Sequence, residues 1–195
     1  MISIEVNAKQ LKELREASGK AKKSFAKELS AGINDTVRKT EVNIGREIRS
    51  VVNLKVKVVK DAIKTRRASA QNLRGIVSLR HEERWGSGLQ HFGARQNKTG
   101  VSYQISKQGG RKTIAGAFMG PKPGQLAPKL HGGVFKRAGK TRLPIVKLYG
   151  VTPYAAYVKN DFDEMEVVFI NKNLQAQIDR RIKLNVLRAN GLVSK

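Results

Sequence analysis

Residues 114–150 (IAGAFMGPKPGQLAPKLHGGVFKRAGKTRLPIVKLYG) constrain the fold most, because short apolar runs alternate there with glycine and proline. Side chains 113, 115, 117 and 119 share one face of an extended chain, and side chains 114, 116 and 118 share the other. The small residues among them allow another backbone to approach closely. After a glycine- and proline-rich loop, short strands are predicted at residues 134–137 and 145–149, the second led by Pro144. The stretch therefore predicts antiparallel strands joined by turns.

Further strands are predicted upstream. Apolar residues alternate with polar ones over residues 1–6, 72–79 and 101–106, which is the pattern of half-buried strands. The turn at Gln108-Gly109-Gly110 joins residues 101–106 to residues 112–119 as a hairpin. Residues 81–88 (HEERWGSG) read as a loop.

Helical spacing dominates both ends of the chain. Asn7 suits the N-cap of a helix that runs to about Ala17. A long helix is predicted over about residues 20–52, and a short helix over residues 56–66 is preferred to a strand. The C-terminal helix spans about residues 154–190, in one piece or in two with a break at Asn160-Asp161. The apolar stripe of the long helix is Ala21, Phe25, Leu29, Ile33, Val37, Ile44, Ile48 and Val51, and that of the C-terminal helix includes Val167, Ile170, Leu174, Ile178, Ile182 and Val186.

Together these patterns predict an α+β fold. A small antiparallel sheet of four to five strands is flanked by a long N-terminal helix and a C-terminal helical segment. Residues 1–70 form the N-terminal helical region, residues 71–150 the β region with its Gly/Pro-rich loop, and residues 151–195 the C-terminal helical region. At 195 residues, the three regions are expected to form one structural domain.

Charge is the strongest compositional signal. The chain carries 39 Lys and Arg against 15 Asp and Glu, a formal net charge of +24. Residues 71–150 hold 15 of the basic residues and only 2 of the acidic ones, and no acid lies between Glu83 and Asp161. So dense a block predicts a nearby polyanion or an acidic protein surface, because like charges repel one another in a lone monomer. The alternative is a basic surface that is simply solvated.

The candidate contact residues follow from this block. Basic side chains around the predicted hairpin and the turn after residue 137 could form one stripe facing phosphate or an acidic neighbour. They are Lys107, Arg111, Lys112, Lys136, Arg137, Lys140 and Arg142. Trp85 could stack on a nucleotide base, but a subunit contact is the preferred interpretation, because tryptophan is enriched at interfaces.

No motif predicts catalysis, a cofactor or a metal. Gly133 and Gly139-Lys140-Thr141 miss the spacing of a phosphate-binding loop, and a strand rather than a helix follows. The histidines (His81, His91 and His131) are scattered, and without cysteine neither disulfides nor thiolate metal sites can form. Glu82 and Glu83 are expected to pair with Arg80 or Arg84. The protein is therefore expected not to be an enzyme, and neither a signal peptide nor a membrane span is expected.

The order of several short motifs resembles the minor tail protein Z family of tailed phages. The motifs are Gly116-Ala117-Phe118, residues 134–137 (VFKR), Gly139-Lys140, Arg142 and Leu143-Pro144-Ile145, with residues 89–95 (LQHFGAR) and 109–113 (GGRKT) upstream. The loop at residues 120–133 departs from the family pattern, since it is longer and richer in proline. Gly116, Ala117, Phe118, Gly139, Pro144 and Ile145 are then expected to serve packing, and Trp85 and Phe92 to serve an interface.

The resemblance implies a structural virion protein. Members of this family are tail completion proteins at the head-proximal end of the tail, where they form part of the neck for head–tail joining. It implies a homo-oligomeric ring, expected to be a hexamer, with the tail terminator and other neck or tail proteins as partners and possible contact with genomic DNA in the channel. Assembly would take place in the host cytoplasm, with no cofactor. The alternative from charge alone is a basic nucleic-acid-binding protein that grips the phosphate backbone.

Overall fold

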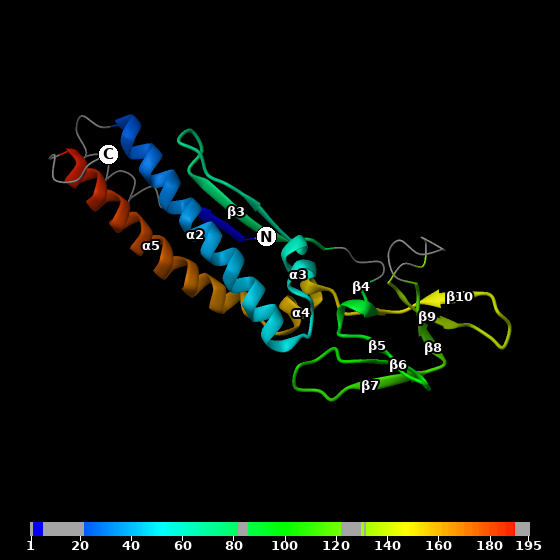
Figure 1. Ribbon diagram of the computed structural model, residues 1–195. Coiled ribbons are helices and arrows are strands. Elements are labelled where there is room, and N and C mark those ends of the chain that lie inside the picture. Colours follow the sequence, from blue (N-terminus) through cyan, green and yellow to red (C-terminus); the bar gives the residue numbers. More distant parts are fainter. Residues whose placement is uncertain (1, 6–21, 82–85, 122–129, 131, 190–195) are drawn as a thin grey trace. The chain divides into compact units, whose positions relative to one another are not determined.

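The computed structural model describes residues 2–5, 22–81, 86–121, 130 and 132–189 (Figure 1). The chain forms two compact units. Unit 1 comprises residues 1–44, 63–79 and 161–195, and unit 2 comprises residues 45–62 and 80–160. Each unit is thus assembled from segments that are distant in the sequence. The predicted helix at residues 8–17 lies outside the described residues, as does most of the loop at residues 120–133.

Unit 1 contains a three-stranded antiparallel sheet in the order β1-β3-β2. The strands are β1 (Ile2–Glu5), β2 (Ile63–Arg66) and β3 (Arg74–Leu79). The strands predicted near residues 1–6 and 72–79 are confirmed. The helix predicted over residues 56–66 is partly wrong, because α3 (Val56–Ala62) ends where β2 begins. Residues 63–66 pair with residues 79–76 of β3, and this non-local pairing overrides a local helical pattern.

The long helix predicted from the apolar stripe is confirmed as α2 (Lys22–Val51). In unit 1 its side chains at Phe25, Leu29, Ile33, Val37 and Ile44 are buried. One side of the helix faces the sheet: a Cβ atom at Gly75 of β3 would lie 2.5 Å from Val37 and 2.9 Å from Ile33. Only glycine therefore lets β3 pass this close to α2.

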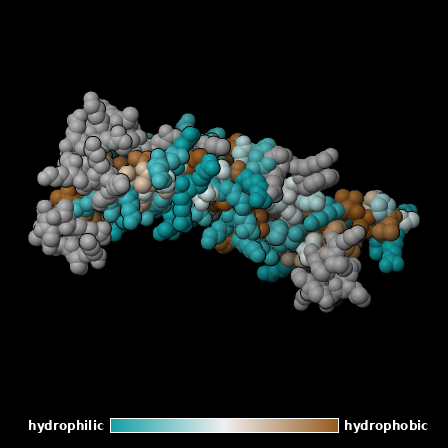
Figure 2. Space-filling model, turned by 90° about the horizontal axis from the view of Figure 1, so that it is seen from above, coloured by the Kyte–Doolittle hydropathy of each residue, from teal (hydrophilic) through white to brown (hydrophobic). Residues whose placement is uncertain are grey.

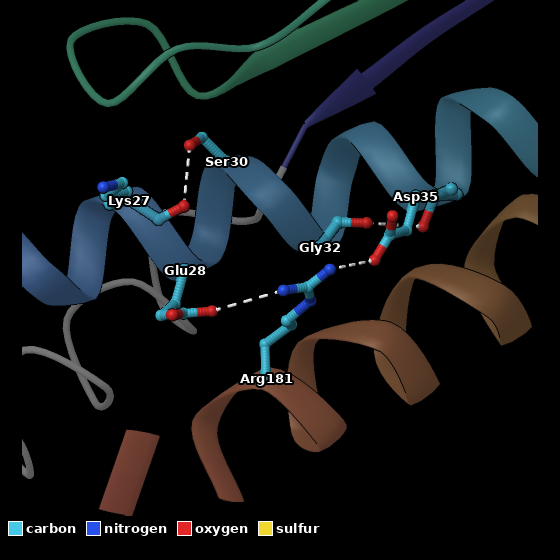
Figure 3. Close-up of polar contacts among 7 residues, drawn as sticks. Lys27, Glu28, Ser30, Gly32, Asp35 and Arg181 are labelled. Atoms are coloured by element: carbon cyan, nitrogen blue, oxygen red, sulfur yellow. Dashed lines mark hydrogen bonds and ion pairs between the residues drawn. The ribbon is translucent and has the colours of Figure 1, made fainter. Parts of the chain in front are cut away.

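The opposite side of α2 packs against α5 (Phe162–Ala189), so that α2 lies between the sheet and α5 (Figure 1). Here Gly32 lies close to the Gln177 backbone, where an added Cβ would be 3.6 Å away. Arg181 donates a hydrogen bond to Asp35 over 2.7 Å and forms an ion pair with Glu28 at 3.6 Å (Figure 3). The hydrogen bond to Asp35, followed by the negative charges of Asp35 and Glu28, raises the pKa of Arg181 despite partial burial, which opposes it. This cation therefore fixes the register between the two helices.

The polar face between α2 and α5 also changes the expected apolar stripe of α5. Ile170, Leu174 and Ile178 are buried as predicted, but Val167 and Val186 are about half exposed, at 52% and 53%. The fully buried position is Glu166, which accepts a hydrogen bond from Asn43 over 2.8 Å. Position 166, and not 167, continues the line of residues 170, 174 and 178 at four-residue spacing.

Unit 2 is built from short strands in several small sheets. One sheet has the order β5-β6-β7, with β5 (Arg95–Gln96), β6 (Gly100–Tyr103) and β7 (Lys112–Ala115). A second has the order β10-β9-β8, with β8 (Ala117–Met119), β9 (Val134–Arg137) and β10 (Ile145–Lys147). β4 (Ser87–Gly88) pairs with β11 (Tyr149–Gly150). The α+β class is therefore confirmed, but the strands form separate antiparallel sheets of two or three strands.

The strand predicted over residues 112–119 is divided in two at Gly116. This glycine has a φ of +70°, and β7 and β8 on either side of it belong to different sheets. The predicted hairpin between residues 101–106 and 112–119 is confirmed in its first half, where β6 pairs with β7. The chain thus turns from one sheet into the next at a residue that tolerates a left-handed backbone.

The C-terminal helical region is confirmed in two pieces. The Thr152 hydroxyl accepts a hydrogen bond from the Ala155 N–H over 2.9 Å and caps α4 (Pro153–Lys159). Asp161 has a φ of +49° and separates α4 from α5. α4 belongs to unit 2 and α5 to unit 1.

Candidate functional site

The positive charge of the protein is concentrated in unit 2. Its residues include 20 Lys and Arg against 4 Asp and Glu, a net charge of +16, whereas unit 1 has 19 against 11, a net charge of +8. The excess arises because residues 84–160, all in unit 2, contain no acid. The candidate site therefore lies among the basic side chains of this unit.

The β10-β9-β8 sheet presents two different faces. Cross-strand pairing places Phe118 opposite Phe135, Phe135 opposite Lys147 and Arg137 opposite Ile145. These five residues form what we call the aromatic face, since paired residues project to the same side. The Phe118 and Phe135 rings stack with centroids 6.0 Å apart, and the Arg137 guanidinium lies 5.8 Å from the Phe118 centroid. Lys136 and Val146 project to the other side.

The turn between β9 and β10 extends the charge beyond the sheet. Lys140 and Arg142 are exposed. Leu143, which follows Arg142 and precedes β10, is 66% exposed. The turn is closed by a hydrogen bond from the Ala138 N–H to the Pro144 carbonyl, 3.0 Å, and one from the Thr141 hydroxyl to the Leu143 carbonyl, 2.5 Å. A strand lies on each side of it, so Gly139-Lys140-Thr141 does not open a helix as a phosphate-binding loop requires.

We call Lys136, Arg137, Lys140, Arg142 and Lys147 the basic cluster. Four of them were predicted as contact residues. Lys147 was not, although the predicted strand 145–149 already placed it two positions from Ile145 and so on the same face. Its Nζ atom lies 5.5 Å from the Tyr149 ring centroid. Figure 2 shows hydrophobic and hydrophilic side chains next to one another at the end of the view where these strands lie.

The other three predicted contact residues belong to a different place. Lys107, Arg111 and Lys112 lie at the tip of the β6–β7 hairpin, which Figure 1 draws at the end of unit 2 opposite the β9–β10 turn. The expectation of one continuous stripe is therefore wrong. Arg111 is engaged within the unit, since its guanidinium donates to the Gly93 carbonyl over 2.7 Å and to the Ser102 carbonyl over 3.1 Å.

The predicted packing residues have distinct roles. Ala117 is 3% exposed, and Phe118 and Ile145 lie on the aromatic face beside Pro144, which precedes β10. A Cβ atom at Gly116 or Gly139 would meet no atom within 4 Å. Close packing therefore explains neither glycine, and the positive φ explains Gly116 alone.

Of the two aromatic residues predicted to lie at an interface, only Phe92 is among the described residues. Phe92 is 0% exposed, and a Cβ atom at Gly150 would lie 2.5 Å from its ring. Its assignment to an interface is therefore wrong: the side chain fills the core of unit 2. Trp85 lies outside the described residues, as do Glu82, Glu83 and His131.

A cavity of about 380 Å³ in unit 2 gathers charges of both signs. Its lining includes Lys57, Asp61, Arg80 and His91. Burial, then the positive charges of Lys55 and Lys147, lower the pKa of His91. The His81 ring instead packs edge-on against Tyr154, with centroids 4.4 Å apart. In the described part of the chain, no group of three or more His, Cys, Asp or Glu side chains is placed to hold a metal ion.

Among the described residues, no helix is long and apolar enough to cross a membrane. In comparisons with known proteins, no family model, no curated protein and no solved structure matches this chain.

Proposed function

We propose that this protein is a structural tail completion protein at the head-proximal end of a phage tail, where several copies form part of the neck ring that joins tail to head. In this proposal the ring is a hexamer, and its partners are the tail terminator and other neck or tail proteins. The protein would act as a virion component, without a cofactor and without catalysing a reaction.

The observation that carries the proposal is where the family-like motifs lie in the fold. Those between residues 89 and 145 all fall in unit 2. Leu89 and Phe92 of the first motif are buried, Gly93 has a φ of +62°, and Gly116 turns the chain between two sheets. The VFKR motif is β9, and Pro144-Ile145 begins β10. Motifs at such positions define the framework of unit 2, and this supports the proposed resemblance in fold and assembly.

The charge of unit 2 supports a role inside an assembly. Six copies at +24 each would bring 144 positive charges into one ring. Such a ring needs acidic neighbours or DNA to offset repulsion, and the isolated protein is therefore expected to be monomeric. Surface charges of this density are screened by salt, so ionic strength should affect assembly strongly.

Light scattering tests the proposal. The mass of the purified protein would be measured alone and mixed with the tail-terminator ring of the same phage, at low and at high salt. We expect a monomer alone and a stoichiometric complex in the mixture. If no complex formed at any salt concentration while the protein bound duplex DNA tightly at low salt, the assembly role would be abandoned.

A second function, binding of nucleic acid, is favoured by one specific feature. The basic cluster adjoins aromatic rings, with Arg137 over Phe118 and Lys147 over Tyr149. Positive grooves lined with aromatic rings are typical of proteins that bind single strands. This function predicts that the logarithm of the binding constant falls steeply and linearly with the logarithm of salt concentration. Fluorescence anisotropy with single-stranded and duplex oligonucleotides would measure it.

A further inference from the structure

β10 is an edge strand whose outward backbone groups have a defined direction. The Leu148 N–H donates to the Val134 carbonyl over 2.8 Å, and the Ala138 N–H donates to the Pro144 carbonyl over 3.0 Å. Antiparallel pairs alternate between hydrogen-bonded and non-hydrogen-bonded positions. Val146 and Lys136 are therefore a hydrogen-bonded pair, and the backbone N–H and C=O of Val146 both point toward β9. The N–H and C=O groups of Ile145 and Lys147 therefore point away from β9.

Nothing in the described part of the chain occupies this outer edge. The sheet order places β10 at the end of its sheet, and no described residue forms a hydrogen bond to the outward groups of Ile145 or Lys147. Proteins normally protect such edges, because unpaired backbone groups are a template for pairing with another chain. The edge is short, with four outward-facing backbone groups on two residues.

The side chains along the edge combine apolar surface with positive charge. Leu143 is 66% exposed and Val146 is 51% exposed. All five residues of the basic cluster are exposed around them. Phosphate would satisfy the cations but would leave Leu143 and Val146 in water, whereas a peptide strand with alternating apolar and acidic side chains would cover both.

A second copy of this chain fits the edge poorly. Antiparallel pairing of two β10 strands would bring together two units of net charge +16 each, with one basic cluster facing the other. Like charges directly across a strand pair are destabilising. Charge complementarity therefore selects an acidic partner and disfavours self-association through this edge.

We propose that β10 is a docking edge for an extended acidic segment of a partner protein, which adds as a fourth strand beside Ile145–Lys147. The backbone of the partner pairs with Ile145 and Lys147, its carboxylates face Arg137 and Lys147 on the aromatic face, and its apolar residues cover Val146 on the other side of the sheet. Strand addition of this kind takes affinity from main-chain hydrogen bonds and specificity from alternate side chains. The inference rests on the geometry of this edge and stands whether or not the protein belongs to a phage neck.

The test uses the full chain and a synthetic probe, a labelled seven-residue peptide of alternating Glu and Val. Binding would be measured by fluorescence anisotropy at low salt. Three further probes separate the contributions: heptaglutamate, which keeps the charge and the backbone but lacks the apolar side chains, the Glu/Val peptide with N-methyl groups along the backbone edge that faces β10, and a 20-base-pair DNA duplex. We expect the Glu/Val peptide to bind at least about tenfold more tightly, roughly 1.4 kcal/mol, than heptaglutamate or its N-methylated form.

Two variants of Lys147 separate backbone from charge. Lys147→Ala removes the charge and keeps the outward N–H, while Lys147→Pro removes both and leaves the ladder to β9 intact, because this N–H is not part of it. We expect Lys147→Pro to bind the peptide about tenfold more weakly than Lys147→Ala. Lys107→Ala, at the hairpin tip, is the matched charge control and should bind nearly as the wild type does. Circular dichroism would confirm that each variant is folded.

Amide exchange of the wild-type protein gives a readout that does not depend on any variant. By NMR, the Ile145 and Lys147 amides should become protected when the Glu/Val peptide binds. Equal affinity for heptaglutamate and the Glu/Val peptide, or exchange at these two amides unchanged in the complex, would overturn the proposal. Tight binding of the duplex with no binding of the peptide would assign the basic cluster to nucleic acid instead.

Discussion

At the scale of single residues, Asn34 holds the tip of the β2–β3 hairpin to α2. Its side-chain amide donates to the Ala68 carbonyl over 3.0 Å and accepts from the Ala68 N–H over 2.8 Å. Ala68 is 8% exposed, so both backbone groups would lose their partner in a buried position. We expect Asn34→Ala to lower the free energy of unfolding by about 2 kcal/mol, measured by urea denaturation.

The sign of this change is informative, because alanine is the better helix former by up to about 0.7 kcal/mol. Helix propensity alone would therefore make Asn34→Ala stabilising. Arg38→Ala, at an exposed position of the same helix, is the control and should change stability by less than about 0.5 kcal/mol. If the Asn34→Ala variant were as stable as the wild type while its Ala68 amide exchanged rapidly, the hairpin would not need this anchor.

His91 makes a second prediction at this scale, on pH dependence. Burial and the charges of Lys55 and Lys147 lower the pKa of His91 in the folded protein, whereas in the unfolded chain it titrates near its ordinary value of about 6.5. Between these two pKa values the unfolded chain binds the proton and the folded chain does not. The folded protein is therefore most stable with respect to His91 above about pH 6.5, where this side chain is neutral in both states. That stability is lost as the pH falls toward the pKa of the folded state.

The measurement compares wild type and His91→Gln by urea denaturation from pH 7.5 to pH 5. Carboxylates titrate in both proteins, so the difference between the two curves isolates His91. We expect the wild type to lose more stability than His91→Gln on acidification. His81→Gln, at an exposed ring, serves as the control. Parallel curves for wild type and His91→Gln would contradict the prediction.

At the scale of elements, Gly116 determines where β7 ends and β8 begins. Its φ of +70° is costly for a residue with a Cβ, although a Cβ there would meet no atom within 4 Å. We expect Gly116→Ala to cost about 1–2 kcal/mol of unfolding free energy, through the backbone alone. Gly116→Asn should cost less, since asparagine tolerates this region better.

Gly139 is the matched control, because a Cβ there also meets no atom and its φ is not positive. Gly139→Ala should therefore be neutral, or stabilising by up to about 1 kcal/mol through the unfolded state. Thermal denaturation of the three variants checks both expectations. Equal losses at positions 116 and 139 would mean that the two glycines share a packing role, as the sequence alone suggests.

The elements that sequence predicts well are those with a long period. The α2 stripe repeats over many turns, and the α4–α5 break is marked by Asn160-Asp161, where asparagine and aspartate accept unusual backbone angles. Residues 63–66 and 116 were misassigned for a different reason. Residues 63–66 become a strand because they pair with β3, and the chain bends at Gly116 because it passes there from one sheet to another. Neither cause is encoded in the local sequence pattern.

At the scale of the whole molecule, the basic character of the site could be predicted from the sequence, but the spatial grouping of its residues could not. The acid-free stretch identified the basic β region, and four residues of the basic cluster followed directly from it. Their separation from Lys107, Arg111 and Lys112 depends on which sheet each hairpin joins. The division into two units is equally non-local, since each collects segments from both halves of the chain. Burial of Phe92 likewise depends on Gly150, 58 residues further along.

The concentration of charge in unit 2 leads to a prediction about the isolated protein. Repulsion within a net charge of +16 destabilises the compact state, and it is strongest at low salt, where the screening length is about 30 Å at 0.01 M. We expect the double variant Lys140→Gln/Arg142→Gln to melt at a higher temperature than wild type at low salt, by about 2–4 °C if the gain is near 1 kcal/mol. In 0.5 M salt the two should converge.

Lys172→Gln/Arg180→Gln, at two exposed positions of α5 in the less charged unit 1, is the matched control and should shift the melting temperature less. A partner that supplies carboxylates would offset the same repulsion, so an acidic peptide should raise the melting temperature of wild type more than that of the double variant. If the double variant and wild type melted together at low salt, the basic cluster would impose no cost on the free protein. Acidic neighbours would then be needed for specificity and not for stability.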